Sequence, residues 1–257
     1  LEFGPPISLC LVLASVTNGD GWQEQSAGSL FGHDFEILQS VLSSTSLSIF
    51  TSNTTTIANC HCMSGIKSAK AALRQKMKTI IAQISCEEKQ KQSKKVFEKL
   101  RSLPQFQESR RISIYLSTKD EINTIPIIKH MFEVNKEVFV PRYKGKEMVM
   151  VKLLSMEDYE KLSLTKWNIK QPNLNDARDN ALETGGLDLI VLPGVAFTTS
   201  GKRLGHGMGY YDKFLESCLK KQQRKPHLIA VAFNEQLWED IPTSETDVLL
   251  DLVLTEK

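Results

Sequence analysis

The sequence predicts an α/β fold: a single three-layer α/β/α domain with a mainly parallel central sheet, preceded by a disordered N-terminal extension. Short apolar runs alternate with helical patterns over most of residues 68–254, the order expected when helices cover both faces of a parallel sheet. The 257 residues, 41% hydrophobic and 24% charged, are enough for one large globular domain. No repeat with a period of about 20–50 residues is present, which argues against a solenoid.

Residues 1–64 differ in composition from the rest of the chain. They are rich in Ser, Thr, Gly and Asn, carry few charges and sustain no hydrophobic period. Such a segment buries too little apolar surface to offset the entropy of ordering. We therefore expect 1–64 to be a disordered or non-native extension and 65–257 to form the domain. A chain that starts at Met63 is expected to be a complete protein.

Two helices are predicted between Ser68 and Leu100. Apolar residues recur at helical spacing on both sides of a break near Ser85. Ser85 followed by Glu87 and Glu88 is typical of a helix N-terminus with acids in its first turn. The first helix is strongly basic, which by itself indicates a solvated face. Its cationic residues are Lys67, Lys70, Arg74, Lys76 and Lys78.

The next elements alternate between strand and helix. Arg111–Ser117 is predicted as a buried strand and Thr124–Val134 as a helix, in whose first turn Pro126 is tolerated. Strands are predicted over Glu137–Tyr143 and, with a looser pattern, Met148–Leu154. A short helix and an extended segment follow at 155–162 and 167–172.

The second half of the domain holds the most apolar strand, Leu187–Leu192. A second central strand is predicted over His227–Phe233, a helix over 211–223, and an edge strand over Val248–Leu254. Ligands of such sheets bind beyond the C-terminal strand ends. We therefore expect a ligand loop after Leu192.

The segment 201–212 is the strongest functional signal in the chain. It has glycines at 201, 205, 207 and 209 and lies between an apolar run and a helical pattern. A glycine-rich turn in that place can expose backbone N–H groups to a phosphate. Asp212, at the start of the helix, can hold a metal ion beside that phosphate. The spacing matches neither a Rossmann fingerprint nor a Walker A loop.

Composition excludes several classes of protein. A net charge of +2, from 32 basic and 30 acidic residues, is too balanced for general nucleic-acid binding. No apolar run approaches the roughly 20 residues that span a bilayer, and the apolar stretch Ile7–Val16 lacks the basic segment of a signal peptide. Five cysteines do not suggest a disulfide framework, and Cys60-His61-Cys62 lacks a second ligand cluster for zinc.

Short blocks around the segment 201–212 occur in an informative order. They are Lys70-x-x-x-Arg74, Asp120-Glu121-Ile122, Pro141-Arg142-Tyr143, Trp167-Asn168-Ile169 with Gln171-Pro172, Thr184-Gly185-Gly186, Arg203 to Asp212, and Asp247 beyond Pro242. Together they resemble 5-formyltetrahydrofolate cyclo-ligases, also called methenyltetrahydrofolate synthetases. The resemblance covers about residues 66–254.

The resemblance implies an ATP- and magnesium-dependent enzyme that converts 5-formyltetrahydrofolate, in mono- or polyglutamylated form, to 5,10-methenyltetrahydrofolate with release of ADP and phosphate. ATP phosphorylates the formyl oxygen, and the neighbouring folate amine then closes the ring. Phosphoryl transfer requires cationic groups, a metal and in-line positioning. A cytoplasmic monomer, with a mitochondrial pool as the alternative compartment, and no nucleic-acid or membrane partner are expected.

The resemblance also implies roles for individual residues. Lys70 and Arg74, four residues apart on one helix face, would bind the ATP phosphates, and Asp212 and Asp247 would hold magnesium. The expected catalytic residues are Arg203, His206 and Tyr210. The other expected ATP contacts are Gly205, Gly207, Met208, Gly209 and Tyr211, although packing is the favoured role for Tyr211. The expected folate contacts are Leu116, Glu121, His206 and Tyr210, with Phe139, Tyr143 and Trp167 either walling the pterin pocket or lying in the core.

Three residues depart from the family pattern. Met208 stands where the family has glycine or lysine, His206 where animal members often have arginine, and Thr198 in place of an aspartate. Loss of one cation at such a site costs on the order of 2–4 kcal/mol of transition-state stabilisation. One alternative is therefore a catalytically weakened paralogue that binds folate or nucleotide. Another is a different enzyme on the same sheet plan, a sugar-phosphate isomerase or acyl transferase with Glu121 or Asp188 as its carboxylate.

Overall fold

The computed structural model describes residues 47–165, 168–244 and 247–257, with side chains from residue 65 onward. The chain divides into two compact units, Leu1–Asn53 and Thr54–Lys257. The predicted extension falls largely outside the described residues and stays a prediction. The side chains of Trp167 and of Cys60-His61-Cys62 also lie outside them.

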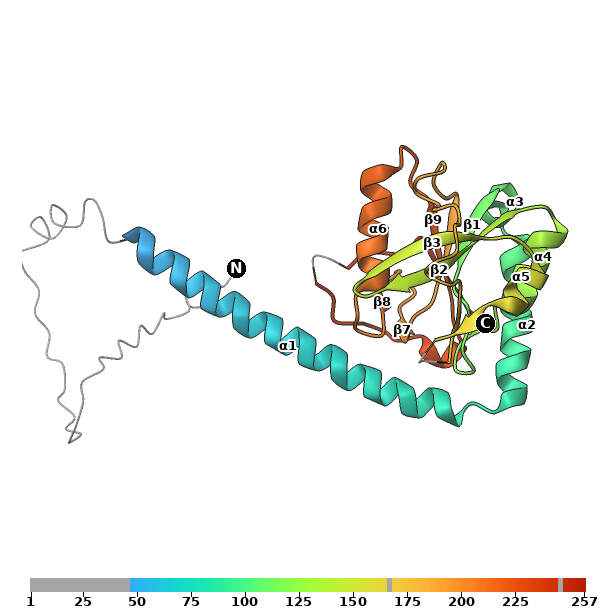
Figure 1. Ribbon diagram of the computed structural model, residues 1–257. Coiled ribbons are helices and arrows are strands. Elements are labelled where there is room, and N and C mark those ends of the chain that lie inside the picture. The colour runs from blue at the N-terminus through green and yellow to red at the C-terminus, as the bar shows by residue number, and fades with distance from the viewer. Residues whose placement is uncertain (1–46, 166–167, 245–246) are drawn as a thin grey trace, which may run out of the picture. The chain divides into compact units, whose positions relative to one another are not determined.

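The second unit is built on a six-stranded sheet with the order β10-β9-β6-β1-β2-β3 (Figure 1). Its neighbouring strands run parallel except β3, which pairs antiparallel with β2. The strands are β1 (Arg111–Ile114), β2 (Glu137–Lys144), β3 (Glu147–Leu153), β6 (Leu189–Leu192), β9 (His227–Val231) and β10 (Leu252–Leu254). The predicted mainly parallel sheet is confirmed, as is the edge position of the last strand.

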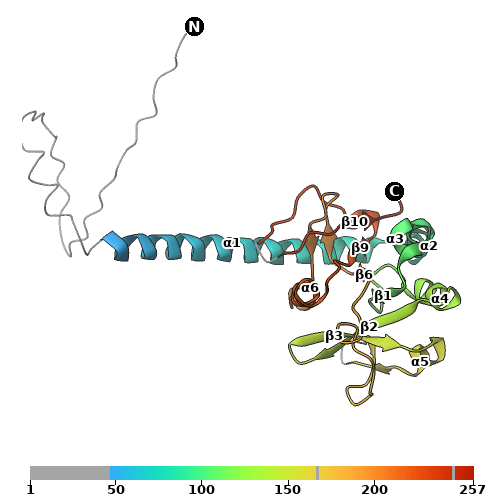
Figure 2. The ribbon, with the colours of Figure 1, turned by 90° about the horizontal axis from the view of Figure 1, so that it is seen from above.

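Helices lie on both faces of the sheet, so the predicted three layers are present. Figure 2 shows α6 (Tyr210–Lys221) on one face and α2 (Cys86–Ser102) and α4 (Ile125–Glu133) on the other. Helix α6 buries Tyr211, Phe214, Leu215 and Cys218, a spacing of i, i+3, i+4 and i+7 that forms one apolar stripe. Two shorter helices, α3 and α5, span Pro104–Glu108 and Met156–Lys161.

The helix boundaries follow from local chemistry. Helix α2 begins after Ser85, whose hydroxyl accepts a hydrogen bond from the Glu88 amide, as the sequence predicts. Helix α4 has Pro126 in its first turn, where the missing N–H of proline removes no hydrogen bond within the helix. Helix α1 spans Leu47–Gln83 and therefore begins well before the predicted Ser68. No helix in the described part of the chain is long and apolar enough to cross a membrane.

Strand β1 is shorter than predicted because side-chain hydrogen bonds, rather than a neighbouring strand, satisfy the backbone groups that follow Ile114. Beyond Ile114, the Thr124 hydroxyl donates to Tyr115 O and accepts from the Ser117 amide, while the Ser117 hydroxyl accepts from the Thr124 amide. These reciprocal bonds replace the ladder and turn the chain away from the sheet. The segment from Leu116 to Glu121 consequently forms a loop at the C-terminal end of β1.

A small hairpin follows the central strand β6, and its second strand lies within the glycine-rich segment 201–212. Strands β7 (Ala196–Phe197) and β8 (Arg203–Leu204) pair antiparallel. Met77 and Ile81 of α1 pack with Ala196 and Leu204 in a second buried cluster. The hairpin thereby holds the glycine segment next to α1. Short strands β4 (Ser163–Leu164) and β5 (Lys170–Gln171) form a further pair, and a 3₁₀ turn spans Asn234–Gln236.

An ion pair away from the glycine segment gives a stability prediction. The Arg178 guanidinium donates to both oxygens of Asp158 at 2.6 and 2.7 Å, and these bonds lower the pKa of that carboxyl below its ordinary value. We expect Asp158→Asn to reduce the free energy of unfolding at pH 7 by about 2 kcal/mol. A depressed folded-state pKa stabilises above the unfolded value, about 3.9, and this gain is lost as the pH falls below it.

Urea unfolding at pH 7 and pH 3 measures this difference, which should shrink at pH 3. Asp240→Asn is the matched control, because Asp240 is exposed and its ion pair is with the half-exposed Lys202. Its effect should be much smaller. An equal loss from both variants, or a loss that does not depend on pH, would contradict the assignment.

Candidate active site

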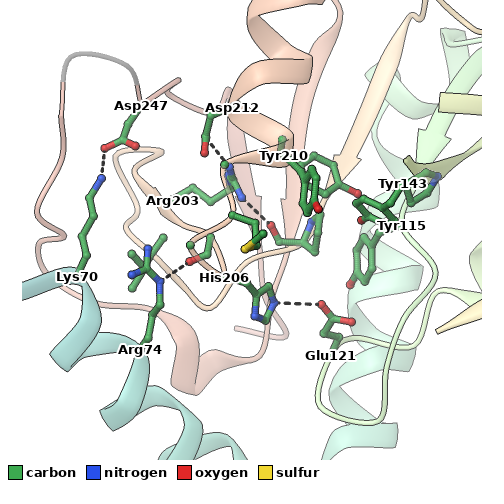
Figure 3. A pocket seen from close by; sticks show the side chains of 18 of the residues that line it. Lys70, Arg74, Tyr115, Glu121, Tyr143, Arg203, His206, Tyr210, Asp212 and Asp247 are labelled. Carbon is green, nitrogen blue, oxygen red and sulfur yellow. Dashed lines mark hydrogen bonds and ion pairs between the residues drawn. The ribbon is translucent and has the colours of Figure 1, made fainter. Parts of the chain in front are cut away.

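A cavity of about 550 Å³ opens beyond the C-terminal ends of the parallel strands (Figure 3). Its wall comes from α1, the loop after β1, the end of β2, and the segment from β8 into α6. The structure brings every residue of the predicted site into this one wall, although their roles stay predictions. These residues are Lys70, Arg74, Leu116, Glu121, Arg203, Gly205, His206, Gly207, Met208, Gly209, Tyr210, Tyr211, Asp212 and Asp247.

Arg203 is the most buried cation of the cavity wall, with 5% of its side chain exposed. Its Nη2 donates to Asp212 Oδ1 at 2.6 Å and its Nη1 to Pro193 O at 3.3 Å. A Cβ atom at Gly205 would lie 3.0 Å from Arg203 Nη1. Strand β8, the start of α6 and the glycine segment thus fix one guanidinium and one carboxylate side by side.

Helix α1 supplies two more cations, each held by a protein acceptor. Lys70 forms an ion pair with Asp247, and Arg74 Nε donates to Gly205 O at 2.8 Å. Asp247 also accepts hydrogen bonds from the backbone and hydroxyl of Ser244. Burial raises the pKa of the Asp247 carboxyl, but the bonds from Lys70 and Ser244 outweigh it and leave this pKa below its ordinary value. Asp247 is therefore an anion at neutral pH.

The glycine segment ends at the N-terminus of α6. Gly207 and Gly209 have φ angles of +102° and +68°, values that favour glycine over other residues. Gly209 is the N-cap of α6 and offers no side-chain hydrogen bond to the first turn. Because glycine has no side chain, the N-cap residue leaves the first N–H groups of α6 open to another acceptor, which is the arrangement that favours an anion. Between the two glycines, Met208 is 62% exposed.

The opposite wall of the cavity combines a carboxylate with aromatic rings. Glu121 Oε2 accepts from the Thr118 amide at 2.8 Å and from the Thr118 hydroxyl at 3.0 Å. Its Oε1 lies 3.7 Å from His206 Nε2. The rings of Tyr143 and Tyr210 meet edge to face at 4.9 Å. This wall offers a fixed hydrogen-bond acceptor beside flat apolar surfaces, which suits a ring with a donor edge.

Two further tyrosines at the cavity differ in hydrogen bonding. The Tyr115 hydroxyl donates to Ile122 O. The Tyr211 hydroxyl is buried and has no hydrogen-bond partner among the described residues. Burial raises the pKa of Tyr211 well above its ordinary value, so its phenol stays neutral.

This unpaired hydroxyl gives a second stability prediction. Tyr211→Phe removes a buried polar group without a partner, so it should raise the free energy of unfolding by about 1 kcal/mol. Thermal unfolding of the unliganded protein measures the change. Tyr115→Phe is the control, because it removes a made hydrogen bond and should lower stability. A lower melting temperature for Tyr211→Phe would show that this hydroxyl has a partner.

Several residues of the wall were not foreseen from the sequence. Thr118 and Ser244 each lie three residues before a predicted acid and donate to it, a local pattern that could have found them. Tyr115 was expected only as part of a buried strand, and Pro141 and Ile169 stand in the motif blocks but were not among the expected site residues. Phe139 is fully buried in the core rather than in the wall.

Other residues considered from the sequence have structural roles. Asp188 accepts from the amides of Arg110 and Arg111, as its position at a strand start suggested. Thr198 is buried in the β7–β8 turn, where its hydroxyl bonds Ser200 and accepts from the Lys202 amide. It does not line the cavity.

The cavity contains two carboxylates that fit a hard divalent cation, Asp212 and Asp247. No group of three or more His, Cys, Asp or Glu residues that could hold a metal occurs in the described part of the chain. Magnesium is often bound by one or two carboxylates together with substrate phosphates. The donor set therefore fits a cation that arrives with a phosphate ligand.

Comparisons with known proteins converge on one family. The model of the 5-formyltetrahydrofolate cyclo-ligase family matches residues 66–256. The mouse 5-formyltetrahydrofolate cyclo-ligase is 46% identical over 193 residues, which cover 74% of this chain and 95% of the mouse protein. A probable 5-formyltetrahydrofolate cyclo-ligase of Caenorhabditis elegans is 46% identical over 76% of this chain and 96% of its own length.

A solved structure shares the fold. The NMR structure of Aquifex aeolicus 5,10-methenyltetrahydrofolate synthetase aligns with a TM-score of 0.60 at 30% identity, over 74% of this chain and 90% of that chain.

Proposed function

The chain belongs to the 5-formyltetrahydrofolate cyclo-ligase family, and from this premise we propose that it converts 5-formyltetrahydrofolate to 5,10-methenyltetrahydrofolate with ATP and magnesium as co-substrate and cofactor. The observation that carries the proposal is the division of the cavity. One side holds paired cations and carboxylates with an uncapped helix N-terminus, and the other holds Glu121 among tyrosines. The first side suits a triphosphate and the second a pterin.

The phosphate side binds and orients ATP. Arg203 lies in the glycine segment, Arg74 donates to Gly205 O from α1, and Lys70 lines the same cavity from α1. Fixed cations and N–H groups of this kind stabilise the charge that spreads over a phosphoryl group in transfer. Asp212 and Asp247 would hold the magnesium ion, which supplies further charge neutralisation when bound.

The folate side presents the formyl group. Glu121 would accept hydrogen bonds from the donor edge of the pterin, and its orientation is fixed by Thr118. The Tyr143 and Tyr210 rings would pack on the flat ring system. Leu116 adds an apolar contact from the loop after β1. His206, next to Glu121, lies between the two sides.

The reaction requires ATP on the phosphate side and the folate on the folate side of the cavity at the same time. The formyl oxygen attacks the terminal phosphorus, ADP leaves, and the oxygen becomes part of a good leaving group. The N10 amine then attacks the formyl carbon, loses its proton, and inorganic phosphate departs. The enzyme's contribution is to hold the formyl oxygen in line with the phosphorus and to exclude water.

Growth of methenyl absorbance tests the proposal. Purified protein with 5-formyltetrahydrofolate, ATP and magnesium should form the product, and omission of ATP or magnesium should stop it. Asp212→Ala is the site control and should form product more slowly at every magnesium concentration. Tight binding of both ligands without product would refute the enzymatic function and favour the binding paralogue. The observation that favours this second function is that Met208, on the phosphate side, is exposed and carries no charge.

We also propose that the reaction takes place in the cytosol. The alternative compartment is the mitochondrion, because a plant relative that is 32% identical is named a mitochondrial 5-formyltetrahydrofolate cyclo-ligase. Cell fractionation with antibody detection tests the compartment.

A further inference from the structure

Helix α2 buries two polar side chains in the face that packs on the rest of the domain. Its buried residues are Gln92, Ser93, Val96 and Leu100, a spacing that places them on one side of the helix. Val96 and Leu100 belong to the main hydrophobic core. Gln92 is fully buried and Ser93 is 8% exposed. A polar group at such a position lowers stability unless it forms hydrogen bonds, so the partners of Gln92 and Ser93 indicate why polar residues occur here.

The two side chains accept hydrogen bonds from backbone amides in the loops that follow β1 and β9. Gln92 Oε1 accepts from the Asn234 amide at 2.8 Å, and Ser93 Oγ accepts from the Asn123 amide at 3.1 Å. Asn123 stands two residues after Glu121, in the loop after β1, which we call the Glu121 loop (residues 116–123). Neither Ser93 nor Asn123 lines the cavity. Ser93 therefore holds the Glu121 loop from outside the cavity.

A second anchor from α2 precedes Glu121 in the loop. Lys89 Nζ donates to Asp120 Oδ1 at 2.8 Å, and the Lys89 side chain is 16% exposed. Lys89 and Ser93 are four residues apart, so they lie on the same side of the helix. Helix α2 thus bonds the residue before Glu121 and the backbone two positions after it. The segment that carries the carboxylate is held on both sides of Glu121.

Within the loop, the Glu121 carboxylate is oriented as well. The Thr118 amide and hydroxyl both donate to its Oε2, and its Oε1 faces His206 at 3.7 Å (Figure 3). The Glu121 side chain is 14% exposed. An acceptor that is fixed before the ligand arrives reduces the entropy lost on binding. Thr118 sets the direction of the carboxylate, and α2 sets the position of the loop.

We propose that Ser93 is a positioning residue for the pterin of the folate substrate and that it acts through Glu121. The inference rests on the proposed function, in which Glu121 accepts hydrogen bonds from the donor edge of the pterin. Without the bond from the Asn123 amide, the Glu121 loop occupies further conformations. The apparent affinity for the folate then falls with the fraction of molecules in the competent conformation. ATP binding is unaffected, because the loop that Ser93 holds lies on the folate side of the cavity.

Equilibrium binding of 5-formyltetrahydrofolate in the absence of ATP tests this role, since no reaction then takes place. For Ser93→Ala we expect the dissociation constant to rise about fivefold, the effect of one net hydrogen bond. In the methenyl assay, KM for the folate should rise by the same factor, while kcat and KM for ATP stay at the wild-type values. Ser93→Thr retains a hydroxyl and should bind the folate more tightly than Ser93→Ala.

Ser109→Ala is the matched control for the loss of a buried serine hydroxyl. Ser109 is 4% exposed and its hydroxyl donates to Gln105 O at 2.6 Å, but it lies outside the Glu121 loop and does not line the cavity. Both variants lose one hydrogen bond, so both should melt at a lower temperature than wild type. Only Ser93→Ala should bind the folate more weakly. Equal folate dissociation constants in the two variants would overturn the positioning role.

A double variant tests whether Ser93 acts through Glu121. Glu121→Ala removes the carboxylate, so the addition of Ser93→Ala should change the dissociation constant by less than about twofold. A further rise of the size measured for Ser93→Ala alone would show that Ser93 supports binding by another route and would contradict the proposal.

These measurements separate the role of Ser93 from the proposed function. An unchanged dissociation constant in Ser93→Ala, with a circular dichroism spectrum like that of wild type, would overturn the positioning role alone. Wild-type protein that binds the folate but forms no methenyl product would contradict the proposed reaction, and the binding series would still decide the role of Ser93. Wild-type protein that binds no folate would overturn both.

Discussion

Replacement of Arg203 by methionine is expected to lower kcat/KM for ATP by on the order of 10²–10³-fold. Arg203 is nearly buried and holds Asp212 at 2.6 Å in the cavity wall. The change removes a fixed cation from the phosphate side and leaves a partly buried carboxylate without its partner. Both effects oppose binding of a triphosphate and so raise KM, and the loss of a fixed cation beside the transferred phosphoryl group should also lower kcat. The methenyl assay at varied ATP concentrations measures it.

Two controls separate charge from geometry at this position. Arg203→Lys keeps a positive charge but loses the planar fork that bonds Asp212 and Pro193 O together, so it should recover only part of the activity. Lys202→Met changes the adjacent residue, whose side chain pairs with Asp240 outside the cavity, and should leave kcat/KM near the wild-type value. Equal losses from Arg203→Met and Lys202→Met would exclude a specific role for Arg203.

The Met208→Lys variant is expected to turn over faster than wild type, by on the order of 10²-fold. Met208 lies between two glycines of positive φ at the N-terminus of α6 and is largely exposed to the cavity. A lysine there would add a flexible cation on the phosphate side without displacing a buried group. The gain should appear in kcat, because the charge on the transferred group is greatest in the transition state.

Met208→Gln is the matched control, since glutamine has a similar length and no charge. It should leave kcat unchanged. His206→Arg combined with Met208→Lys tests whether the second departure from the family pattern adds to the first. Flat turnover in the double variant would show that neither residue limits catalysis, and the paralogue hypothesis would lose its main support.

The sequence predicted most elements because their signals are local. The apolar run at Leu189–Leu192, the N-cap Ser85 and the apolar stripe of α6 all depend on neighbours along the chain. The shortening of β1 was not predictable in this way. It depends on Thr124, which returns to bond the backbone at Tyr115 after an intervening loop.

The candidate site also combines features that depend on neighbouring residues with features that depend on distant ones. The glycine segment, with its positive φ angles and following helix, and the motif residues on either side of it were identifiable from the sequence. The ion pair of Lys70 with Asp247 joins residues 177 positions apart, and it exists because Met77 and Ile81 seat α1 on the β7–β8 hairpin.

Sequence alone thus determined the family resemblance, the mainly parallel sheet and the residues of the candidate site, since periodicity, caps and motif spacing are properties of short segments. Only the tertiary structure decided which cations face which carboxylates, and that the Tyr211 hydroxyl has no hydrogen-bond partner among the described residues. These features arise because α1 packs on the β7–β8 hairpin and α6 packs on β3 and the β2–β3 turn. Such contacts between distant segments leave no periodic trace in the chain.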